Sequence, residues 1–436
     1  MESVMLTRKI PNKRWMRIIP AAVIVYIFSF MDRTNFGFAM AGGMNEELGI
    51  TATMAGLAAG IFFVGYLFLQ FPGGHIAEKG GAKKFIAVSI VAFGVFAMAC
   101  GFAKDIWQMM VLRFLLGVAE GGVWPAILVM LSHWFPNEER ARANALFTMC
   151  LPLATMITGP ISGWIIAAWG WRWVFIIEGA ITIALVAIWW PMVSDRPENA
   201  KWLSNEERDY LVARIKEEQL AFQSGEPVSY KKLIRDINLW KLVVVYFCYQ
   251  VGIYGFAMWL PVILKSLTKM GITYIGLLTI LPYIAAMIGI YVFGVLSDKH
   301  MNRKLYTAIP LAGFALCFYL STQFDNQVWI AYTFLIGCGV FFEAACGVFW
   351  TFPPMLFPSE VAGGARGIIN ALGNMGGFFG PFIVGWCVTK FGSTNIGVYV
   401  LSASLLIGFI TALTLPEITS TGIPNNASVS SRDTGV

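Results

Sequence analysis

The chain has 436 residues, of which 57% are hydrophobic and 13% are charged, and its formal net charge is +6. A soluble domain carries about 25% charged residues, so this composition excludes an ordinary soluble enzyme. Apolar runs of roughly 20 residues, long enough to cross the hydrocarbon core of a membrane, recur along nearly the whole chain.

We interpret twelve of these runs as transmembrane helices, because they are too long and too rich in glycine for the alternating strands of a membrane barrel. The first run has no small-residue cleavage site before Asp32, so it is not expected to be a cleaved signal peptide. The expected fold class is an all-α membrane protein of two pseudo-symmetric six-helix bundles. The runs are residues 18–42, 52–72, 84–103, 107–131, 142–168, 172–192, 241–266, 275–297, 304–322, 327–352, 364–389 and 395–415.

The distribution of Lys and Arg predicts the orientation, because basic residues near helix ends stay on the cytoplasmic side. They precede the first run and recur in alternate loops, whereas the first opposite loop carries Glu46 and Glu47 without a basic residue. Both termini are therefore predicted to be cytoplasmic, with the chain in the inner membrane of a bacterium. The same asymmetry explains the net charge, and nucleic-acid binding is not expected.

A charged stretch that cannot lie in lipid separates the two sets of six runs. Within it, Ser204 followed by acidic residues predicts the N-cap of a short surface helix. The end of the chain is rich in Ser, Thr, Asn and Gly and is expected to be disordered. The predicted parts are residues 1–193 and 241–416 as the two bundles, 194–240 as a cytoplasmic linker and 417–436 as the tail.

The loops after the second helix of each half repeat one pattern of glycine, acidic and basic residues. Such a loop turns tightly, and its acid can pair with a neighbouring helix end in one conformation and release it in another. We therefore expect both copies to act in conformational gating, although the positive-inside bias alone would also produce basic turns. The candidate gating residues are Gly74, Glu78, Lys79 and Gly81 in the first copy and Gly294, Asp298 and Lys299 in the second, where Met301 replaces the second glycine.

The paired loops, the twelve helices and the linker resemble the major facilitator superfamily over almost the whole chain. MDRTNFGFA at 31–39, LRFLLGVAEGG at 112–122 and INALGNMGGFFGP at 369–381 resemble its anion:cation symporter family, and within it permeases for sugar acids, tartrate and 4-hydroxyphenylacetate. The resemblance implies alternating access around a site at the middle of the membrane, with proton-driven uptake of a carboxylate.

Four ionisable residues at membrane depth are the candidate functional charges of the first half: Asp32, Arg33, Arg113 and Glu120. Arg113 and Glu120 are seven residues apart and so share one helix face. We expect Asp32 and Glu120 to carry protons, Arg33 to anchor the substrate carboxylate, and Arg113 to pair with Glu120 and contribute to substrate binding. The family resemblance assigns the same roles, and the alternative is a neutral cluster that only fixes helix packing.

The second half offers mainly uncharged candidates. Asn370 and Asn374 lie one turn apart on one helix face and are expected to bind substrate hydroxyls or the carboxylate. Trp350 and Asn370, and Tyr66 in the first half, match positions where relatives of the family touch substrate. Helix packing or anchoring at the membrane interface is an equal alternative for the two aromatic residues. Glu343 departs from the family pattern. Its spacing predicts a face shared with Trp350, and it is a candidate proton site, an acceptor for substrate hydroxyls or an amine, or a packing residue.

No group of cysteines or histidines has metal-ligand spacing, so no metal or organic cofactor is expected and protons are the expected coupling ion. No motif supplies a nucleophile with a base or a phosphate-binding loop, which argues against an enzyme. We expect a monomer in the bilayer whose partner is a small organic anion. A permease for 4-hydroxyphenylacetate or phthalate-type acids, an uncoupled carrier and a proton-driven exporter remain alternatives, although two deep arginines disfavour a cationic drug.

Overall fold

The computed structural model describes residues 13–222, 230–324, 326–357 and 359–416, and these form helices and connecting turns without a strand. They contain 12 helical spans long and apolar enough to cross a membrane, which confirms the predicted runs. The first half comprises α1 (Lys13–Ala39) with η2 (Met40–Met44) and α2 (Asn45–Glu47), α3 (Ala52–Glu78), α4 (Ala82–Cys100), α5 (Ile106–Gly121) with α6 (Val123–Trp134), α7 (Asn137–Thr148) with α8 (Cys150–Trp169), and α9 (Trp171–Ala184) with α10 (Val186–Met192).

The second half contains the other six spans, and several of them are interrupted by short turns. The break after α17 is the one that matters for the site, since it begins at a buried acid. The elements are α13 (Ile237–Thr268), α14 (Ile272–Leu278) with α15 (Ile280–His300), α16 (Arg303–Ser321), α17 (Val328–Phe342) with α18 (Cys346–Phe349) and α19 (Phe352–Leu356), α20 (Ser359–Asn374) with α21 (Gly376–Phe391), and α22 (Thr394–Leu413).

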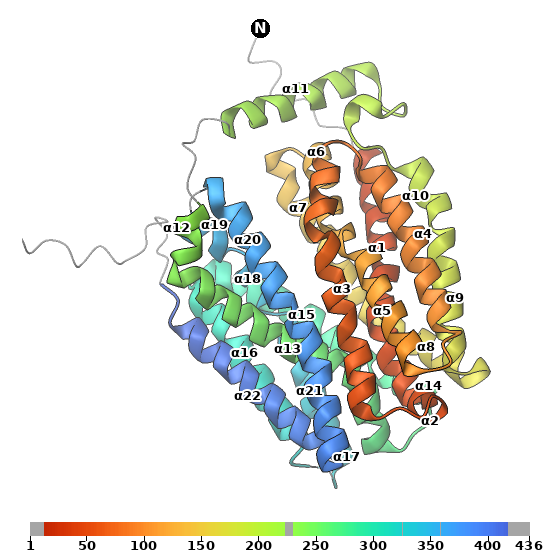
Figure 1. Cartoon of the computed structure of the whole chain (residues 1–436). Coiled ribbons are helices and arrows are strands. Elements are labelled where there is room, and N and C mark those ends of the chain that lie inside the picture. Colours follow the sequence, from red (N-terminus) through yellow and green to blue (C-terminus); the bar gives the residue numbers. More distant parts are fainter. Residues whose placement is uncertain (1–12, 223–229, 325, 358, 417–436) are drawn as a thin grey trace, which may run out of the picture.

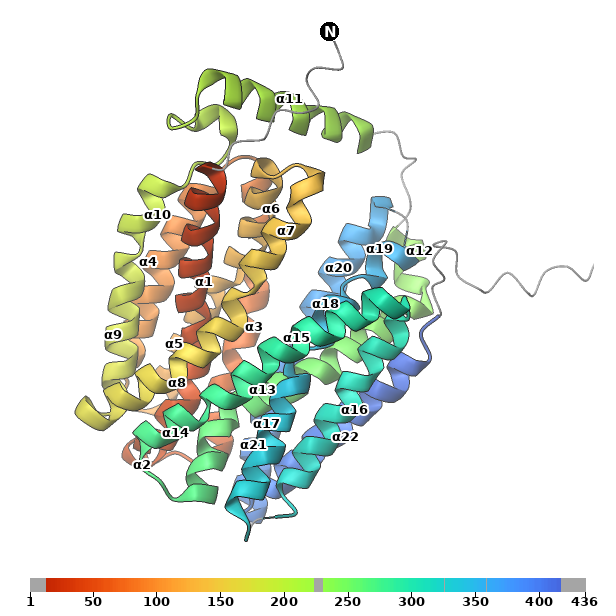
Figure 2. The ribbon, with the colours of Figure 1, turned by 180° about the vertical axis from the view of Figure 1, so that it is seen from behind.

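The two halves lie side by side and converge at the end of the molecule that is remote from the linker helix α11 (Asn205–Phe222) (Figures 1 and 2). Glycines make the close contacts there. A Cβ atom on Gly56 of α3 would lie 2.5 Å from the Pro381 carbonyl oxygen of α21, and one on Gly159 of α8 would lie 2.7 Å from the Gly276 carbonyl oxygen of α14. Glycine permits this approach because it lacks a side chain.

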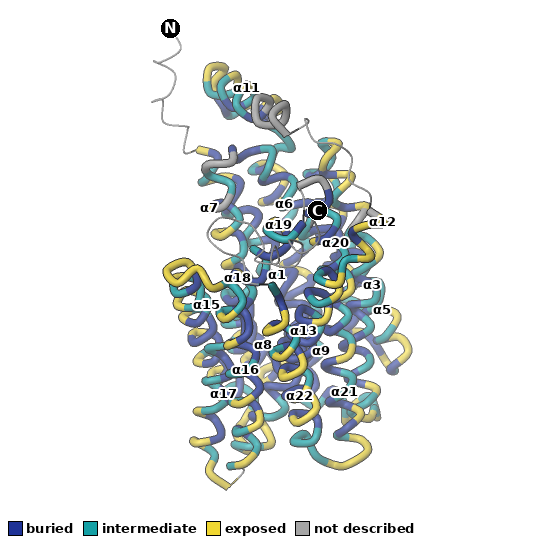
Figure 3. Tube along the Cα trace, turned by 90° about the vertical axis from the view of Figure 1, so that its left-hand side faces the viewer, coloured by how far each residue is buried: buried dark blue, intermediate teal, exposed yellow. Residues whose placement is uncertain are grey.

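Burial follows the same arrangement: the interior faces of the helices are buried, and exposure is greatest at the loops and on the outward faces (Figure 3). The long helix α13 is the most enclosed span, with 89% of its central window buried. It packs against α20, α21 and α22 of its own half and against α1 of the other half. Side chains on α1 and α13 therefore meet in the middle of the molecule.

The linker contributes α11, which crosses the end of the first half, and α12 (Tyr230–Arg235) (Figure 1). The predicted N-cap is present, because Ser204 Oγ accepts a hydrogen bond from Glu207 N at 3.3 Å and Glu207 Oε2 accepts one from Ser204 N at 3.2 Å. This reciprocal pair is a capping box. The linker is fastened to the first half where the rings of Trp134 and Trp202 stack at 5.2 Å. The predicted disordered tail, 417–436, lies outside the described residues.

Candidate functional site

The four predicted charges of the first half meet in one buried cluster. Asp32, Arg33, Arg113 and Glu120 are each at most 3% exposed. Arg33 forms an ion pair with Glu120, in which Arg33 Nε donates to Glu120 Oε1 at 2.7 Å. Ser29 Oγ donates to the same oxygen at 2.6 Å. The second carboxyl oxygen, Oε2, has no hydrogen-bond partner within the described part of the chain, so Glu120 keeps acceptor capacity.

The expected pairing of Arg113 with Glu120 is wrong. Arg113 Nη1 instead donates to the main-chain oxygen of Asp32 at 2.8 Å, and its guanidinium lies over the ring of Phe36, 4.8 Å from the centroid. Seven residues correspond to about 10 Å along a helix, so Arg113 and Glu120 share a face but meet different levels of α1. Glu120 lies level with Ser29 and Arg33, whereas Arg113 lies level with Asp32 and Phe36.

A third buried acid, Glu178 on α9, was missed by the sequence analysis. It is 1% exposed and accepts hydrogen bonds from Asn35 Nδ2 at 2.8 Å and from Ser162 Oγ at 3.0 Å. Asn35 Nδ2 also lies 3.4 Å from Asp32 Oδ1, so one amide group joins the two carboxyls. The available signal was a lone acid inside the apolar run 172–192.

Glu178 changes the charge balance of the cluster. Two acids and two arginines would be neutral, as expected from the sequence, but three ionised carboxylates beside two guanidinium groups carry a formal charge of −1. A buried cluster with an uncompensated charge is costly. One bound proton makes this cluster neutral.

Aromatic side chains surround the Arg33 guanidinium. Its Cζ lies 4.5 Å from the ring centroid of Tyr66, the predicted substrate-contacting tyrosine, and 5.4 Å from that of Phe62. Arg33 Nη2 donates to the Tyr26 hydroxyl at 3.0 Å, and Nη1 donates to the Tyr254 hydroxyl at 3.4 Å. Because Tyr254 belongs to α13, Arg33 lies where the two halves meet.

The two predicted asparagines belong to a chain of amide hydrogen bonds that joins the halves. Asn374 Nδ2 donates to Asn370 Oδ1 at 3.0 Å, and Asn370 Nδ2 donates to Gln70 Oε1 of α3 at 3.1 Å. At the other end, Gln250 Nε2 of α13 donates to Asn374 Oδ1 at 2.9 Å. We name Gln70, Asn370, Asn374 and Gln250 the amide chain. Both glutamines were missed, although each is a polar residue within or beside an apolar run.

Trp350 and Glu343 lie in turns between short helices. The expectation that they share a helix face assumed an unbroken helix, and it is wrong because α17 ends at Phe342 and α18 begins only at Cys346. The ring of Trp350 packs against Tyr246 at 5.0 Å. Glu343 is 9% exposed and follows Phe342, whose main-chain oxygen accepts a hydrogen bond from the Tyr249 hydroxyl at 2.7 Å and whose ring lies 5.6 Å from that of Tyr283.

The two repeated loops turn differently. In the first loop the residue with left-handed backbone is Gly80, with φ 83°, whereas the predicted Gly81 has φ −107°. In the second loop Met301, at the position equivalent to Gly81, has a left-handed φ of 52°. Gly74 and Gly294 are not the crowded glycines, since a Cβ on Gly74 would touch only Pro125 at 3.7 Å and one on Gly294 would touch nothing within 4 Å.

The acids of these loops stay within their own half in this structure. Asp298 pairs with Arg303 of the same loop at 2.5 Å. The Glu78 carboxylate is 3.8 Å from His75, and the Glu78 main-chain oxygen accepts a hydrogen bond from Arg196 Nη2 at 2.9 Å. Lys79 and Lys299 lie beside these acids and are largely exposed. The predicted gating role stays a prediction.

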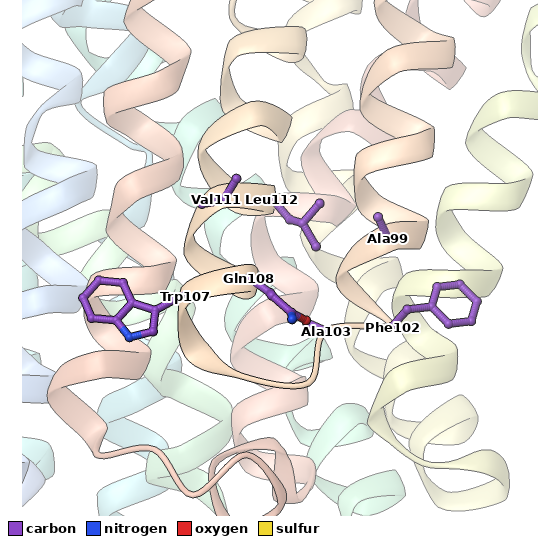
Figure 4. A pocket seen from close by; sticks show the side chains of 7 residues that line it. All are labelled: Ala99, Phe102, Ala103, Trp107, Gln108, Val111 and Leu112. Atoms are coloured by element: carbon purple, nitrogen blue, oxygen red, sulfur yellow. The ribbon is translucent and has the colours of Figure 1, made fainter.

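A surface pocket lies between α4 and α5 (Figure 4), and no residue of the charged cluster lines it. Its lining is apolar except for Gln108, whose Oε1 accepts a hydrogen bond from Lys104 N at 3.0 Å. Phe102 and Trp107 at its rim are exposed. This arrangement suits contact with lipid and offers no charged group to bind a polar ligand.

Comparison with known proteins gives one family over most of the chain. The model of the Major Facilitator Superfamily matches residues 22–381. A relative from Agrobacterium vitis named "Putative tartrate transporter" is 35% identical, over 94% of this chain and 92% of its own length. A relative from Escherichia coli (strain K12) named "Probable galactarate/D-glucarate transporter GudP" is 27% identical, over 92% of this chain and 95% of its own length. The crystal structure of a D-xylose-proton symporter superposes with a TM-score of 0.74 at 15% identity, over 94% of this chain and 99% of that chain.

Proposed function

The chain belongs to the Major Facilitator Superfamily, a family of transporters and not of enzymes, and from this premise we propose that it is a proton-coupled symporter for an organic carboxylate. The proposed substrate is a sugar acid or a related hydroxy acid. It would be imported across the bacterial inner membrane by alternating access. The coupling ion is the proton, and no other cofactor takes part.

The observation that carries this proposal is the buried ion pair between Arg33 and Glu120 at the meeting of the two halves. Arg stays charged at any relevant pH and binds a carboxylate through two parallel hydrogen bonds. While Glu120 is ionised, it satisfies Arg33. A proton on Glu120 leaves the guanidinium without its counter-ion, and a substrate carboxylate then takes that place.

Asp32 provides the second proposed proton site. Its Oδ2 atom is buried without a hydrogen-bond partner among the described residues, and its Oδ1 shares the Asn35 amide with Glu178. With one proton distributed over Asp32 and Glu178, the cluster is neutral while Glu120 stays ionised. A second proton on Glu120 would then accompany the substrate anion, so that proton and anion enter the cluster together.

The amide chain and the relatives support the substrate class. Amide groups on α20 can donate to and accept from substrate hydroxyls, and the names of the relatives from Agrobacterium vitis and Escherichia coli refer to hydroxylated acids. The rings of Tyr66 and Phe62 around Arg33 favour a second candidate, an aromatic carboxylate of the 4-hydroxyphenylacetate kind.

The close contacts between the halves at the end remote from α11 support a state that is open toward the linker side. With the termini and the linker in the cytoplasm, as the basic residues predict, this is the inward-open state. Substrate release and proton release would then occur on the cytoplasmic side.

Proteoliposomes with a trapped pH-sensitive dye test the proposal. With a panel of aldonates, aldarates and hydroxyphenylacetates outside, we expect at least one acid to carry protons inward and to accumulate under an inward proton gradient. Glu120→Gln is expected to abolish accumulation while retaining exchange of labelled for unlabelled substrate, because glutamine mimics the protonated acid. Glu46→Gln, the same change at an exposed acid, is the control. Accumulation by Glu120→Gln would exclude Glu120 as an essential coupling site.

A further inference from the structure

Glu343 occupies a break in a helix at membrane depth. The backbone turns at Glu343, with φ −124° and ψ 9°, between the end of α17 and the start of α18. Non-helical backbone inside a membrane is tolerated where it is buried in protein or lines a cavity, and broken helices contribute substrate sites in transporters. The break therefore marks a position where the second half can present a polar group to a ligand.

Glu343 and Arg33 face the same region from opposite halves. The helix α13 contacts both: the Tyr249 hydroxyl donates to the main-chain oxygen of Phe342, the residue before Glu343, at 2.7 Å, and Tyr254 lies five residues further along the same helix. The Tyr254 hydroxyl accepts a hydrogen bond from Arg33 Nη1 at 3.4 Å, so the Arg33 guanidinium and the turn at Glu343 both lie against the segment 249–254 of α13. A ligand with its carboxylate on Arg33 would extend past Tyr254 toward Glu343.

Glu343 is the buried acid that has no partner within the described part of the chain. Glu120 and Glu178 each accept at least two hydrogen bonds from protein groups, whereas no described residue donates to or pairs with the Glu343 carboxyl. The nearby Tyr249 hydroxyl is already used, because it donates to the Phe342 main-chain oxygen at 2.7 Å. The Glu343 oxygens are not among the fully enclosed atoms without a partner, so they retain access to open space, where a ligand could supply the donor.

We propose that Glu343 determines specificity by accepting a hydrogen bond from a hydroxyl group at the far end of the substrate. This inference rests on the proposed function and narrows its substrate class to polyhydroxy monocarboxylates. A dicarboxylate would bring its second negative charge against Glu343, which forms no ion pair with a cation among the residues that the structure describes. Juxtaposed like charges in a buried site discriminate strongly against the wrong ligand.

Two pairs of acids, each differing at one carbon atom, test this inference. L-Threonate and D-gluconate end in a hydroxymethyl group. Their matched acids, L-tartrate and D-glucarate, carry a second carboxylate at that carbon atom. Binding to the purified full chain would be measured by isothermal titration calorimetry. We expect the wild type to bind at least one monocarboxylate about 10-fold or more tightly than its matched dicarboxylate, the scale on which a site discriminates by a single polar group.

Glu343→Gln removes the negative charge and keeps the shape, so the preference is expected to fall to within about 2-fold. Glu343→Asp keeps the charge and is expected to keep the preference, and Glu46→Gln is the control with an equal change far from the site. Equal affinities within each pair for the wild type, an unchanged preference in Glu343→Gln, or no binding of any of the four acids would each overturn the inference. The wild-type ratio is decisive even if Glu343→Gln does not fold.

The proposed symport is read separately, from proton entry into proteoliposomes. Preferential binding of L-threonate or D-gluconate without proton entry would contradict symport and leave the role of Glu343 standing. Proton entry that is equally efficient with L-tartrate and with L-threonate would support symport and contradict the proposed role of Glu343.

Discussion

The two halves of the molecule treat buried polar groups in opposite ways. In the first half, Arg33 and Glu120 form an ion pair, and Asn35 joins Glu178 to Asp32 through hydrogen bonds. In the second half, neutral amides bond to one another, and Glu343 is a buried acid without a hydrogen-bond partner among the described residues. A network whose members satisfy one another can exchange protons at low cost, whereas an unpaired acceptor is suited to a group that arrives with the ligand.

The largest expected effect comes from breaking the ion pair of the first half. Arg33→Gln removes the proposed anchor and leaves Glu120 without its cation, which typically costs about 3–5 kcal/mol for a buried pair. We expect no measurable uptake and a lower melting temperature in detergent. The double variant Arg33→Gln/Glu120→Gln should recover stability and not uptake. Recovery of neither would mean that the pair does not set the stability of this region.

Glu178→Gln tests whether the third acid takes part in coupling. Glutamine fixes this position as neutral, so Asp32 no longer needs to share a proton with it. We expect accumulation to fall about 10-fold with a change in substrate affinity of about 2-fold or less, on the scale usual for proton-transfer groups. Ser162→Ala removes one hydrogen bond to Glu178 without changing its charge and is the matched control. Equal losses in both variants would point to packing and not to charge.

The amide chain of the second half should respond more mildly. Asn374→Leu removes the acceptor of one Gln250 hydrogen bond and the donor to Asn370 Oδ1, and an unsatisfied buried polar group costs about 1–3 kcal/mol. We expect a lower melting temperature and an increase in the apparent KM for a hydroxylated acid of about 5-fold, with coupling to protons preserved. Loss of coupling in this variant would contradict the division between the halves.

The two repeated loops offer the smallest expected effect. Gly80→Ala places a side chain at φ 83° and should lower stability by about 1 kcal/mol, whereas Met301→Gly relieves the same kind of strain at φ 52° and should raise it by a fraction of that amount. Melting temperatures measured side by side would check the opposite signs. A loss of stability in Met301→Gly would show that the Met301 side chain contributes more than its backbone strain costs.

The length and composition of the apolar runs predicted all twelve spans, because a membrane imposes helix length directly. The breaks after Gly121 and Phe342 were not predicted, since packing between helices sets them and no local residue pattern announces them. Of the site, the sequence identified the residues of the charged cluster apart from Glu178. It paired Glu120 with Arg113 and not with Arg33. Helix periodicity predicts which face of a helix a residue lies on, but not which residue of the neighbouring antiparallel helix lies opposite it.

The glycines at the closed end remote from α11 are positions where a substitution could change which conformation the protein adopts. A methyl group on Gly56 would lie 2.5 Å from the Pro381 carbonyl oxygen, and one on Gly159 would clash with the Thr279 hydroxyl oxygen and lie 2.7 Å from the Gly276 carbonyl oxygen, so backbone atoms crowd both positions. A single alanine at either position would act as a wedge between the halves. Such variants would favour the opposite conformation, and would supply an antigen for selecting antibody fragments that recognise it.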